Sequence, residues 1–160
     1  MVVNTTMPVT HLHIEASSFC NARCPGCPRN AYGYPLEGFY KQAHLKPEKL
    51  AEILNKFPEV QSILYCGNHG DPMMNPDIVE LCDVGKSIKI ATNGGIGRLE
   101  DYELLAENKA YITFGIDGLE DTNHLYRQGV KWDNLMKRVK TFISAGGQAT
   151  WQFIKFQHNM

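Results

Sequence analysis

Three cysteines, Cys20, Cys24 and Cys27, fall within eight residues of one segment, FCNARCPGCPRN. Thiolates gathered in this way bind iron–sulfur clusters or zinc. A cluster held by three protein thiolates leaves one iron open for chemistry, whereas a structural zinc site needs a fourth protein ligand. Three free thiols in a loop are the third alternative. The histidines that could complete a zinc site are His11, His13 and His44.

The two remaining cysteines have a different setting. Cys66 ends an apolar run and Cys82 occupies an apolar position of an expected helix, so we interpret both as core residues. An odd number of cysteines, three of them closely spaced, favours metal ligation over disulfides. This pattern, together with an N-terminus that does not resemble a signal peptide, predicts a cytoplasmic protein.

The composition limits the classes of function. A hydrophobic content of 43% in 160 residues is enough for one core, so we expect a single domain. The 16 basic and 17 acidic side chains give a formal net charge of -1, which provides no broad attraction for nucleic acid or anionic membranes. The apolar runs are too short to span a bilayer. Any partner must therefore be recognised locally.

Short apolar runs alternate with segments of helical periodicity along the whole chain. This alternation predicts an α/β fold in which parallel strands are joined by right-handed crossovers and the helices pack outside. The expected strands cover residues 12–14, 62–66, 88–92, 111–116 and 150–156, and the expected helices cover residues 46–57, 75–85, 99–108 and 131–147.

A polar or glycine-containing motif follows each expected strand. In parallel α/β folds the ligand lies at the carboxyl ends of the strands, so these motifs predict a site on one rim of the sheet. The first strand also alternates His11, His13 and Glu15 with apolar residues, which indicates either substrate contacts or a solvent-facing strand edge. In chain order the motifs are FCNARCPGC, GNHGDP, TNGG, DGLEDTNHLYR and QHN.

The Cys-x3-Cys-x2-Cys spacing of CNARCPGC resembles the signature of the radical S-adenosylmethionine superfamily. The resemblance implies a partial (β/α) TIM-like barrel of about five parallel strands with outer helices. It also implies that Cys20, Cys24 and Cys27 hold a 4Fe-4S cluster whose fourth iron is chelated by S-adenosylmethionine. A reductant such as flavodoxin or ferredoxin would supply an electron for cleavage to a 5'-deoxyadenosyl radical, which abstracts hydrogen from a substrate.

Later loops resemble family motifs in the same order. Gly70 and Asp71 in GNHGDP match the motif that binds the methionine amino group, and Asn93 in ATNGG matches a residue near the ribose or the substrate. FGIDGLEDTNHLYR resembles a segment of the branch with SPASM or twitch extensions, where Asp117 ends the strand and Arg127 matches an arginine that reaches the S-adenosylmethionine carboxylate. The resemblance implies that Asp117 also contacts the cofactor. By residue type alone, GDP is an ordinary turn and Arg127 is a surface side chain.

The sequence also departs from the family. Gly26 stands where many relatives have an aromatic or bulky residue near the adenine, so we expect this contact to rest on backbone. Gly115 replaces a frequent serine. We expect one core domain over residues 1–160 that lacks the last β/α unit and any auxiliary-cluster domain, with a sheet edge that self-associates or binds a partner chain. The alternatives are a non-catalytic iron–sulfur or zinc-binding module and one half of a split enzyme.

Overall fold

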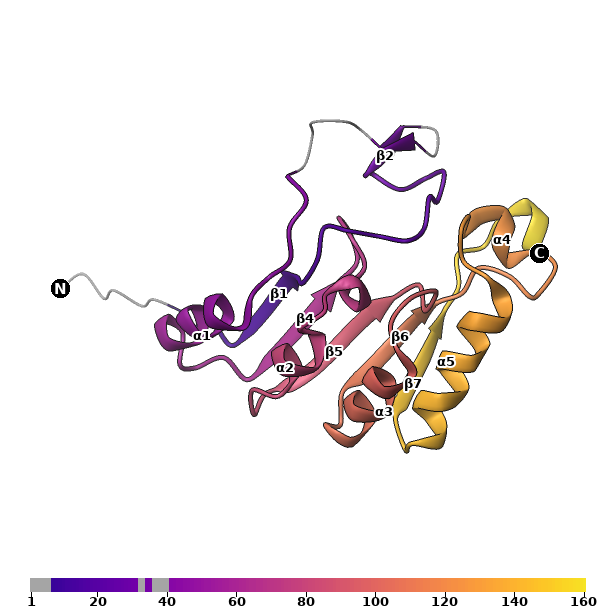
Figure 1. Ribbon diagram of the computed structural model, residues 1–160. Coiled ribbons are helices and arrows are strands. Elements are labelled where there is room, and N and C mark those ends of the chain that lie inside the picture. The colour runs from indigo at the N-terminus through magenta and orange to yellow at the C-terminus, as the bar shows by residue number, and fades with distance from the viewer. Residues whose placement is uncertain (1–6, 32–33, 36–40) are drawn as a thin grey trace.

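A single five-stranded sheet organises the chain in the computed structural model, which describes residues 7–31, 34–35 and 41–160 (Figure 1). Its strand order is β1-β4-β5-β6-β7, and every neighbouring pair is parallel. A separate antiparallel pair, β2 (Asn30–Ala31) and β3 (Tyr34–Pro35), was not predicted. The sheet strands are β1 (His11–Glu15), β4 (Ser62–Cys66), β5 (Ser87–Thr92), β6 (Tyr111–Gly115) and β7 (Gln148–Gln152).

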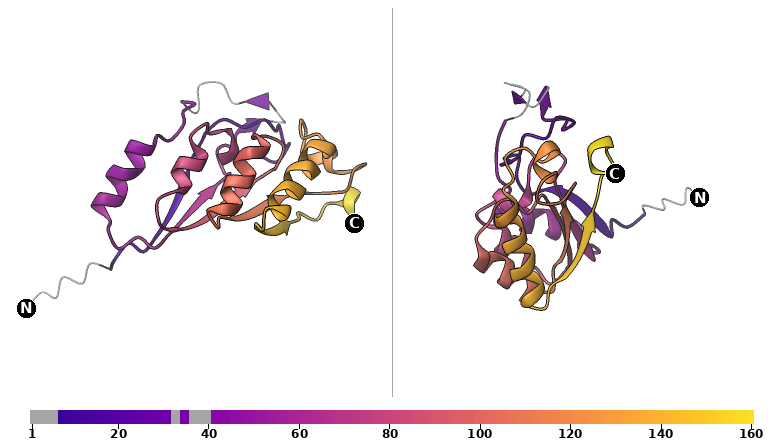
Figure 2. Two further views of the ribbon diagram at one scale, coloured as in Figure 1. Left: turned by 60° about the horizontal axis from the view of Figure 1, so that its bottom comes forward. Right: turned by 90° about the vertical axis from the view of Figure 1, so that its right-hand side faces the viewer.

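The longer helices lie side by side on one face of this sheet (Figure 2). They are α1 (Pro47–Lys56), α2 (Ile78–Cys82), α3 (Leu99–Glu107) and α5 (Trp132–Ser144), with a short α4 (Asn123–Tyr126) before α5 and two 3-10 turns, η1 (Pro72–Met74) and η2 (Gln157–Asn159). This arrangement confirms the α/β class and the parallel strands that the alternating pattern predicts. Among the described residues, we find no helix with both the length and the apolar character that a membrane crossing requires.

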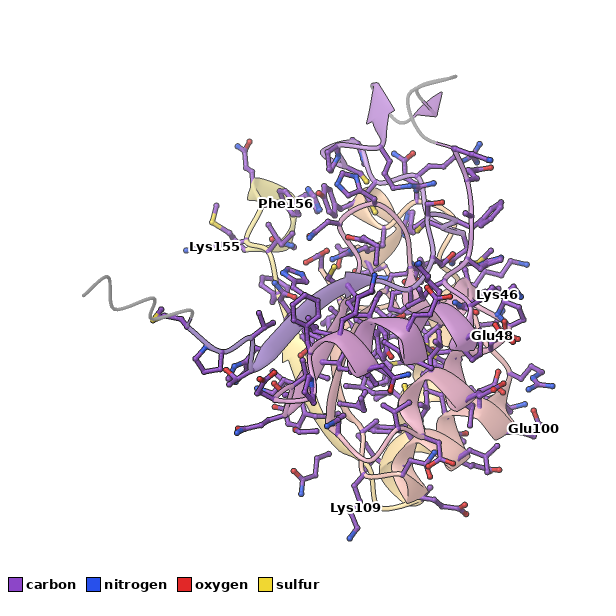
Figure 3. All side chains as sticks on the ribbon, turned by 90° about the vertical axis from the view of Figure 1, so that its left-hand side faces the viewer. Lys46, Glu48, Glu100, Lys109, Lys155 and Phe156 are labelled. Carbon is purple, nitrogen blue, oxygen red and sulfur yellow. The ribbon has the colours of Figure 1, made fainter. Side chains whose placement is uncertain are left out.

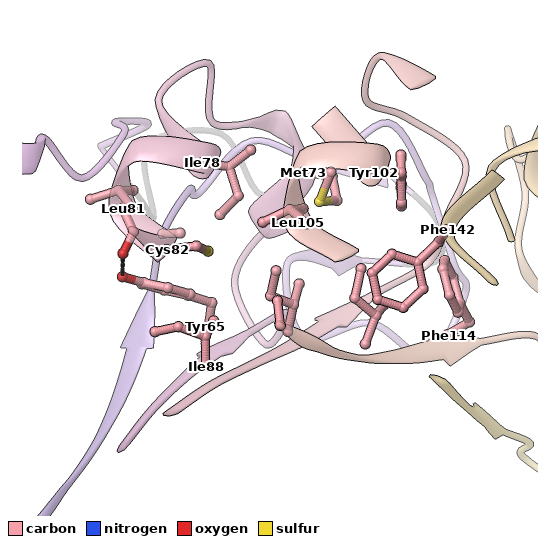
Figure 4. Close-up of a cluster of buried hydrophobic side chains, with 14 of the residues drawn as sticks. Tyr65, Met73, Ile78, Leu81, Cys82, Ile88, Tyr102, Leu105, Phe114 and Phe142 are labelled. Carbon is pink, nitrogen blue, oxygen red and sulfur yellow. Dashed lines mark hydrogen bonds between the residues drawn. The ribbon is translucent and has the colours of Figure 1, made fainter. Parts of the chain in front are cut away.

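The core lies between the helices and the sheet. Because side chains alternate between the two faces of a strand, one set of strand residues is buried under the helices. The Tyr65 hydroxyl donates a hydrogen bond to the Leu81 carbonyl at 2.6 Å and fixes α2 to the sheet (Figure 4). Cys82 belongs to this cluster and is 4% exposed, as predicted. The strand residues that belong to this core cluster are Ile63, Tyr65, Ile88, Ile90, Ile112 and Phe114.

The last strand was predicted too far along the chain. β7 ends at Gln152, whose carbonyl accepts the final sheet hydrogen bond from Ile116 N at 3.0 Å. Two residues later, Ile154 N donates instead to Asp117 Oδ1 at 2.7 Å. A buried carboxylate therefore draws the chain out of the sheet, although residues 153–156 are apolar enough to suggest a strand. The QHN motif forms the η2 turn.

The helix expected at residues 75–85 is also shorter, because the buried side chain of Asn75 is hydrogen-bonded to other segments of the chain. Its Nδ2 donates to the carbonyls of Ala16 at 2.7 Å and Leu45 at 2.9 Å, while its Oδ1 accepts from Asp77 N. These contacts hold residue 75 to the segment after β1. The chain consequently forms η1 first and begins α2 only at Ile78.

Candidate functional site

A cavity of about 390 Å³ opens at the carboxyl ends of the parallel strands. Its wall combines the loops after β1, β4 and β5 with residues of β6 and α4. Every residue predicted for the site lines this cavity except Asp117, which lies behind the wall. The predicted residues on the wall are Cys20, Cys24, Cys27, Gly26, Gly70, Asp71, Asn93 and Arg127.

The cysteine loop is held by backbone hydrogen bonds at two points. Cys27 N donates to the Cys24 carbonyl at 3.0 Å, and Arg23 N donates to the Gln128 carbonyl at 2.9 Å, which ties the loop to the residues after α4. Burial, and then the nearby Asp71 carboxylate, raises the pKa of Cys20 to about 11. Burial also raises the pKa of Cys24. Such thiols become good ligands only when a bound cation compensates the thiolate charge.

Several N–H groups are directed at the sulfur atoms. Cys20 Sγ accepts from Ala22 N at 3.4 Å and from Asn93 Nδ2 at 3.6 Å, and Arg127 Nη1 lies 3.9 Å from Cys24 Sγ. Hydrogen bonds to ligand sulfurs tune iron–sulfur clusters, so this donor set fits such a cluster. In the described part of the chain, no three His, Cys, Asp or Glu side chains converge well enough to hold one metal ion. A 4Fe-4S cluster does not require that convergence, because each thiolate binds a different iron.

The three candidate zinc ligands lie in different places. His13 lines the cavity. His11 is at the opposite end of β1, where Nδ1 hydrogen-bonds the Thr10 hydroxyl at 2.8 Å. The His44 ring stacks on Phe19, with centroids 4.7 Å apart. Of these histidines, His13 is therefore the one placed at the cavity.

Asp71 is occupied by hydrogen bonds from the protein itself. Its carboxylate accepts from Met73 N at 3.0 Å, from Asn93 N at 2.8 Å and from the Thr92 hydroxyl at 2.8 and 3.0 Å, and the residue is 2% exposed. Burial raises the pKa of Asp71, although these hydrogen bonds act in the opposite direction. The residue also donates its N–H to the Phe19 carbonyl at 2.8 Å. Asp71 thus joins three loops, and the direct pairing of its carboxylate with an ammonium group stays a prediction.

Asn93 is fixed by the same network. Its Nδ2 donates to Asn21 Oδ1 at 3.0 Å, and its Oδ1 accepts from Gly95 N at 2.7 Å. The side chain therefore bridges the cysteine loop and the loop after β5. The sequence did not indicate that Asn21 bonds Asn93 or that Thr92 bonds Asp71, because these hydrogen bonds connect loops that are distant in the sequence.

Arg127 extends into the cavity wall and is 20% exposed, so its reading as a surface residue is wrong. Its Nε donates to Asp117 Oδ2 at 2.5 Å. Asp117 is fully buried and does not reach the cavity. The structure gives Asp117 the task of holding Arg127, whereas the sequence had suggested a direct ligand contact.

Two glycines on the wall leave space that α4 fills. A Cβ atom on Gly26 would lie 3.1 Å from the Tyr126 hydroxyl oxygen, and a Cβ on Gly115 would lie 2.6 Å from Arg127 Nη2. Tyr126 therefore places an aromatic ring beside position 26, where many relatives carry their own aromatic or bulky residue; the backbone contact with adenine at Gly26 stays a prediction. The serine missing at position 115 makes room for the guanidinium group.

Cys66 is a buried core residue as predicted, and it also lines the cavity. Its thiol donates to Glu15 Oε1 at 3.0 Å, and Asn68 N donates to the same oxygen at 3.1 Å. Burial, and then Glu15, raises the pKa of Cys66 to about 12. The alternation of side chains along β4 could have indicated that Cys66 faces the cavity. Cys66 lies two residues after Leu64, which lines the cavity, whereas Tyr65 between them points to the opposite face.

Solved structures with a similar fold include "Native anSMEcpe with bound AdoMet", with a TM-score of 0.68, 18% identity and coverage of 90% of this chain and 44% of that one. A second is "Crystal structure of methylornithine synthase (PylB)", with a TM-score of 0.63, 17% identity and coverage of 90% and 44%. The chain thus spans less than half of the length of these proteins. At this identity the likeness establishes the fold, which is the expected partial (β/α) TIM-like barrel.

A third similar structure is "Structure of TYW1 with a lysine-pyruvate adduct bound", with a TM-score of 0.56, 14% identity and coverage of 96% of this chain and 55% of that one. No curated protein sequence matches the chain. The sequence profile of the family described as "Radical SAM superfamily" matches residues 14–156. Because this match extends over most of the chain, the protein belongs to the radical SAM superfamily.

Proposed function

We propose that this chain is a radical S-adenosylmethionine enzyme core that uses a 4Fe-4S cluster to cleave S-adenosylmethionine and abstract hydrogen from a substrate. The observation that carries the proposal is that Cys20, Cys24 and Cys27 share one cavity wall with the motifs that follow β4, β5 and β6. Four separate stretches of sequence, each similar to a family motif, contribute to the same 390 Å³ space.

In this proposal the three thiolates hold the cluster, which supplies the electron for reductive cleavage to methionine and a 5'-deoxyadenosyl radical. Arg127 binds the S-adenosylmethionine carboxylate, since an arginine fork matches that group. Gly70 allows close backbone approach, and Asp71 and Asn93 hold the surrounding loops in place. Tyr126 presents an aromatic ring at the wall beside Gly26.

The branch of the family, the domain organisation, the electron donor and the position of the substrate are further parts of the proposal. We place the chain in the branch with SPASM or twitch extensions, because its FGIDGLEDTNHLYR segment brings Arg127 to the cavity. The single five-stranded sheet supports our proposal of one core domain over residues 1–160. A small redox protein such as flavodoxin or ferredoxin is the proposed electron donor. The substrate would face the helix-free side of the sheet, where Thr113, Gln152 and His13 line the cavity.

Anaerobic reconstitution with iron and sulfide, followed by S-adenosylmethionine and dithionite, tests this function. We expect a brown protein that forms 5'-deoxyadenosine, measured by liquid chromatography, because the open iron and the cavity wall together bind the cosubstrate. The control reaction omits dithionite and should form none. A colourless protein with stoichiometric zinc would support instead a zinc-binding module completed by His13, which lines the cavity.

The free edge of β7 supports a further proposal about partners. All five residues of Gln148–Gln152 are exposed, and β6 pairs with one side of the strand. An exposed edge offers unpaired backbone groups to another strand, so we propose that a second copy or a partner chain pairs there. The last strand was expected at residues 150–156, so the proposed edge contact now lies on the observed strand, Gln148–Gln152.

We expect amide protons of residues 148–152 to become protected from hydrogen exchange as protein concentration rises, or on addition of a partner, because edge pairing gives them acceptors. Exchange mass spectrometry and sedimentation velocity would measure this together. The amides of α1, which lies at the opposite edge of the sheet from β7 (Figure 1), serve as the internal control. A monomer at high concentration with rapid exchange throughout 148–152 would contradict the proposal.

A further inference from the structure

Asp117 links the rest of the cavity wall to residues 154–159, a segment that reaches the cavity through Ile154. One carboxylate oxygen, Oδ2, accepts from Arg127 Nε at 2.5 Å, and the other, Oδ1, accepts from Ile154 N at 2.7 Å. The Asp117 carbonyl accepts from Asn159 Nδ2 at 2.7 Å. A single buried residue therefore holds the arginine on one side and residues 154–159 on the other.

Asn159 closes this segment on itself. Its Nδ2 also donates to the Ile154 carbonyl at 2.9 Å, and its Oδ1 accepts from Phe156 N at 2.6 Å. The Asn159 side chain therefore makes three hydrogen bonds, to Asp117, Ile154 and Phe156. Loss of the Asn159 amide would release the η2 turn and weaken the position of Ile154.

Phe156 contacts the other end of the same wall. Its ring packs on Tyr126, with centroids 4.4 Å apart, and stacks on His158 at 5.3 Å. Figure 3 labels Phe156 on the segment that leads to η2. Since Tyr126 directly precedes Arg127, residues 154–159 support both side chains that α4 and its C-cap place at the cavity.

Elsewhere on the wall, the guanidinium group of Arg127 contacts the Cys24 sulfur, 3.9 Å from Nη1, and the Tyr126 ring, 5.6 Å from its centroid. Gly115 contributes no side chain, and the guanidinium group fills the space that a Cβ would need. The pair with Asp117 is strong only while water is excluded, because an ion pair weakens as the local dielectric constant rises. Residues 154–159 cover Asp117 Oδ1 and its carbonyl, so they keep the pair shielded.

We propose that residues 154–159 form a clamp that positions Arg127 through Asp117 and thereby sets how strongly the site recognises a ligand carboxylate. The inference rests on the proposed function, in which Arg127 binds the carboxylate of S-adenosylmethionine. Asn159 is a positioning residue in this scheme, since it acts through Asp117 and does not line the cavity. The clamp makes recognition of one end of the cosubstrate depend on a segment beyond the last strand.

The test compares the dissociation constants of S-adenosylmethionine and decarboxylated S-adenosylmethionine, measured by calorimetry on anaerobically reconstituted protein. The dissociation constant of decarboxylated S-adenosylmethionine divided by that of S-adenosylmethionine reports the carboxylate contact, and this ratio is insensitive to a general loss of affinity. For Arg127→Ala we expect this ratio to fall on the order of 10- to 100-fold, as a charge-assisted hydrogen bond is lost. For Asn159→Ala we expect a fall of about 3- to 10-fold, as the arginine is held less firmly.

Two further variants keep the test decisive. Gln157→Ala lies in the same turn, has an exposed side chain and should keep the wild-type ratio. Asn159→Asp keeps the acceptor for Phe156 N but loses the donor to Asp117, so it should lower the ratio even if Asn159→Ala does not fold. A lowered ratio with unchanged iron content separates positioning from unfolding.

The outcomes distinguish the two levels of the proposal. If Arg127→Ala lowers the ratio while both Asn159 variants keep it at the wild-type value, the clamp is wrong and the carboxylate site stands. If the wild-type protein binds both ligands equally, or binds neither, the proposed role of Arg127 fails and the clamp fails with it.

Discussion

Replacing any one of Cys20, Cys24 and Cys27 with alanine is expected to reduce bound iron to background after anaerobic reconstitution. A cluster with three protein ligands has no spare thiolate, so the loss of any one sulfur leaves an iron without its protein ligand. Iron and sulfide per chain, together with visible absorption, would measure the loss. The effect should be close to complete for each of the three positions.

Cys82→Ala is the matched control for these variants. This thiol is 4% exposed in the layer between α2 and the sheet and does not line the cavity, so the variant should keep wild-type iron content. Cys66→Ala is a second comparison, because Cys66 lines the cavity from β4 and is bonded to Glu15. If Cys66→Ala loses as much iron as Cys24→Ala, the assignment of the three ligands is wrong.

Gly70→Ala is expected to produce the largest loss of stability. A Cβ at this position would lie 1.8 Å from the backbone oxygen of Ser17 and 2.9 Å from that of Phe19. Backbone atoms cannot rotate away, so the segment that leads into Cys20 would have to move. Overpacking typically costs about 1–3 kcal/mol and occasionally more, and we expect a cost of about 3 kcal/mol or above here. Urea unfolding of the protein before reconstitution would measure it.

The same displacement should lower iron content, because Ser17 lies only three residues before Cys20. Gly85→Ala provides the control. Gly85 has a φ of 64° and nothing within 4 Å of its Cβ position, so that variant carries only the cost of a left-handed conformation, about 1–2 kcal/mol. Gly70→Ala with wild-type stability and iron content would show that the loop after β4 does not press on the cysteine loop.

The sheet and the position of the site could be predicted from local patterns. The apolar runs of β4, β5 and β6 are buried on one face, and their alternation with helical segments is enough to imply parallel order. Parallel order then places every following loop on one rim. Cys20, Cys24 and Cys27 could be assigned to that rim because their spacing is local and lies directly after β1.

The features that the sequence did not reveal depend on contacts between distant residues. The apolar run from Phe153 to Phe156 has strand character, but the Asp117 carboxylate takes Ile154 N at 2.7 Å and ends the pairing. Asp71 is a turn residue by type, and Met73 N in its own turn donates to its carboxylate, but the three other hydrogen bonds come from the distant Thr92 hydroxyl and Asn93 N. Neither role is encoded in neighbouring residues, so no local pattern could indicate it.

The packing of α4 against the two wall glycines has an evolutionary consequence. With 3.1 Å between the Tyr126 hydroxyl oxygen and the Cβ position of Gly26, a bulky side chain at position 26 would displace the Tyr126 side chain. The same reasoning applies to Gly115 and Arg127, where the separation is 2.6 Å. Residues in direct contact are generally not additive, so the two members of each pair are expected to be epistatic: the effect of a larger residue at position 26 or 115 depends on the residue at position 126 or 127.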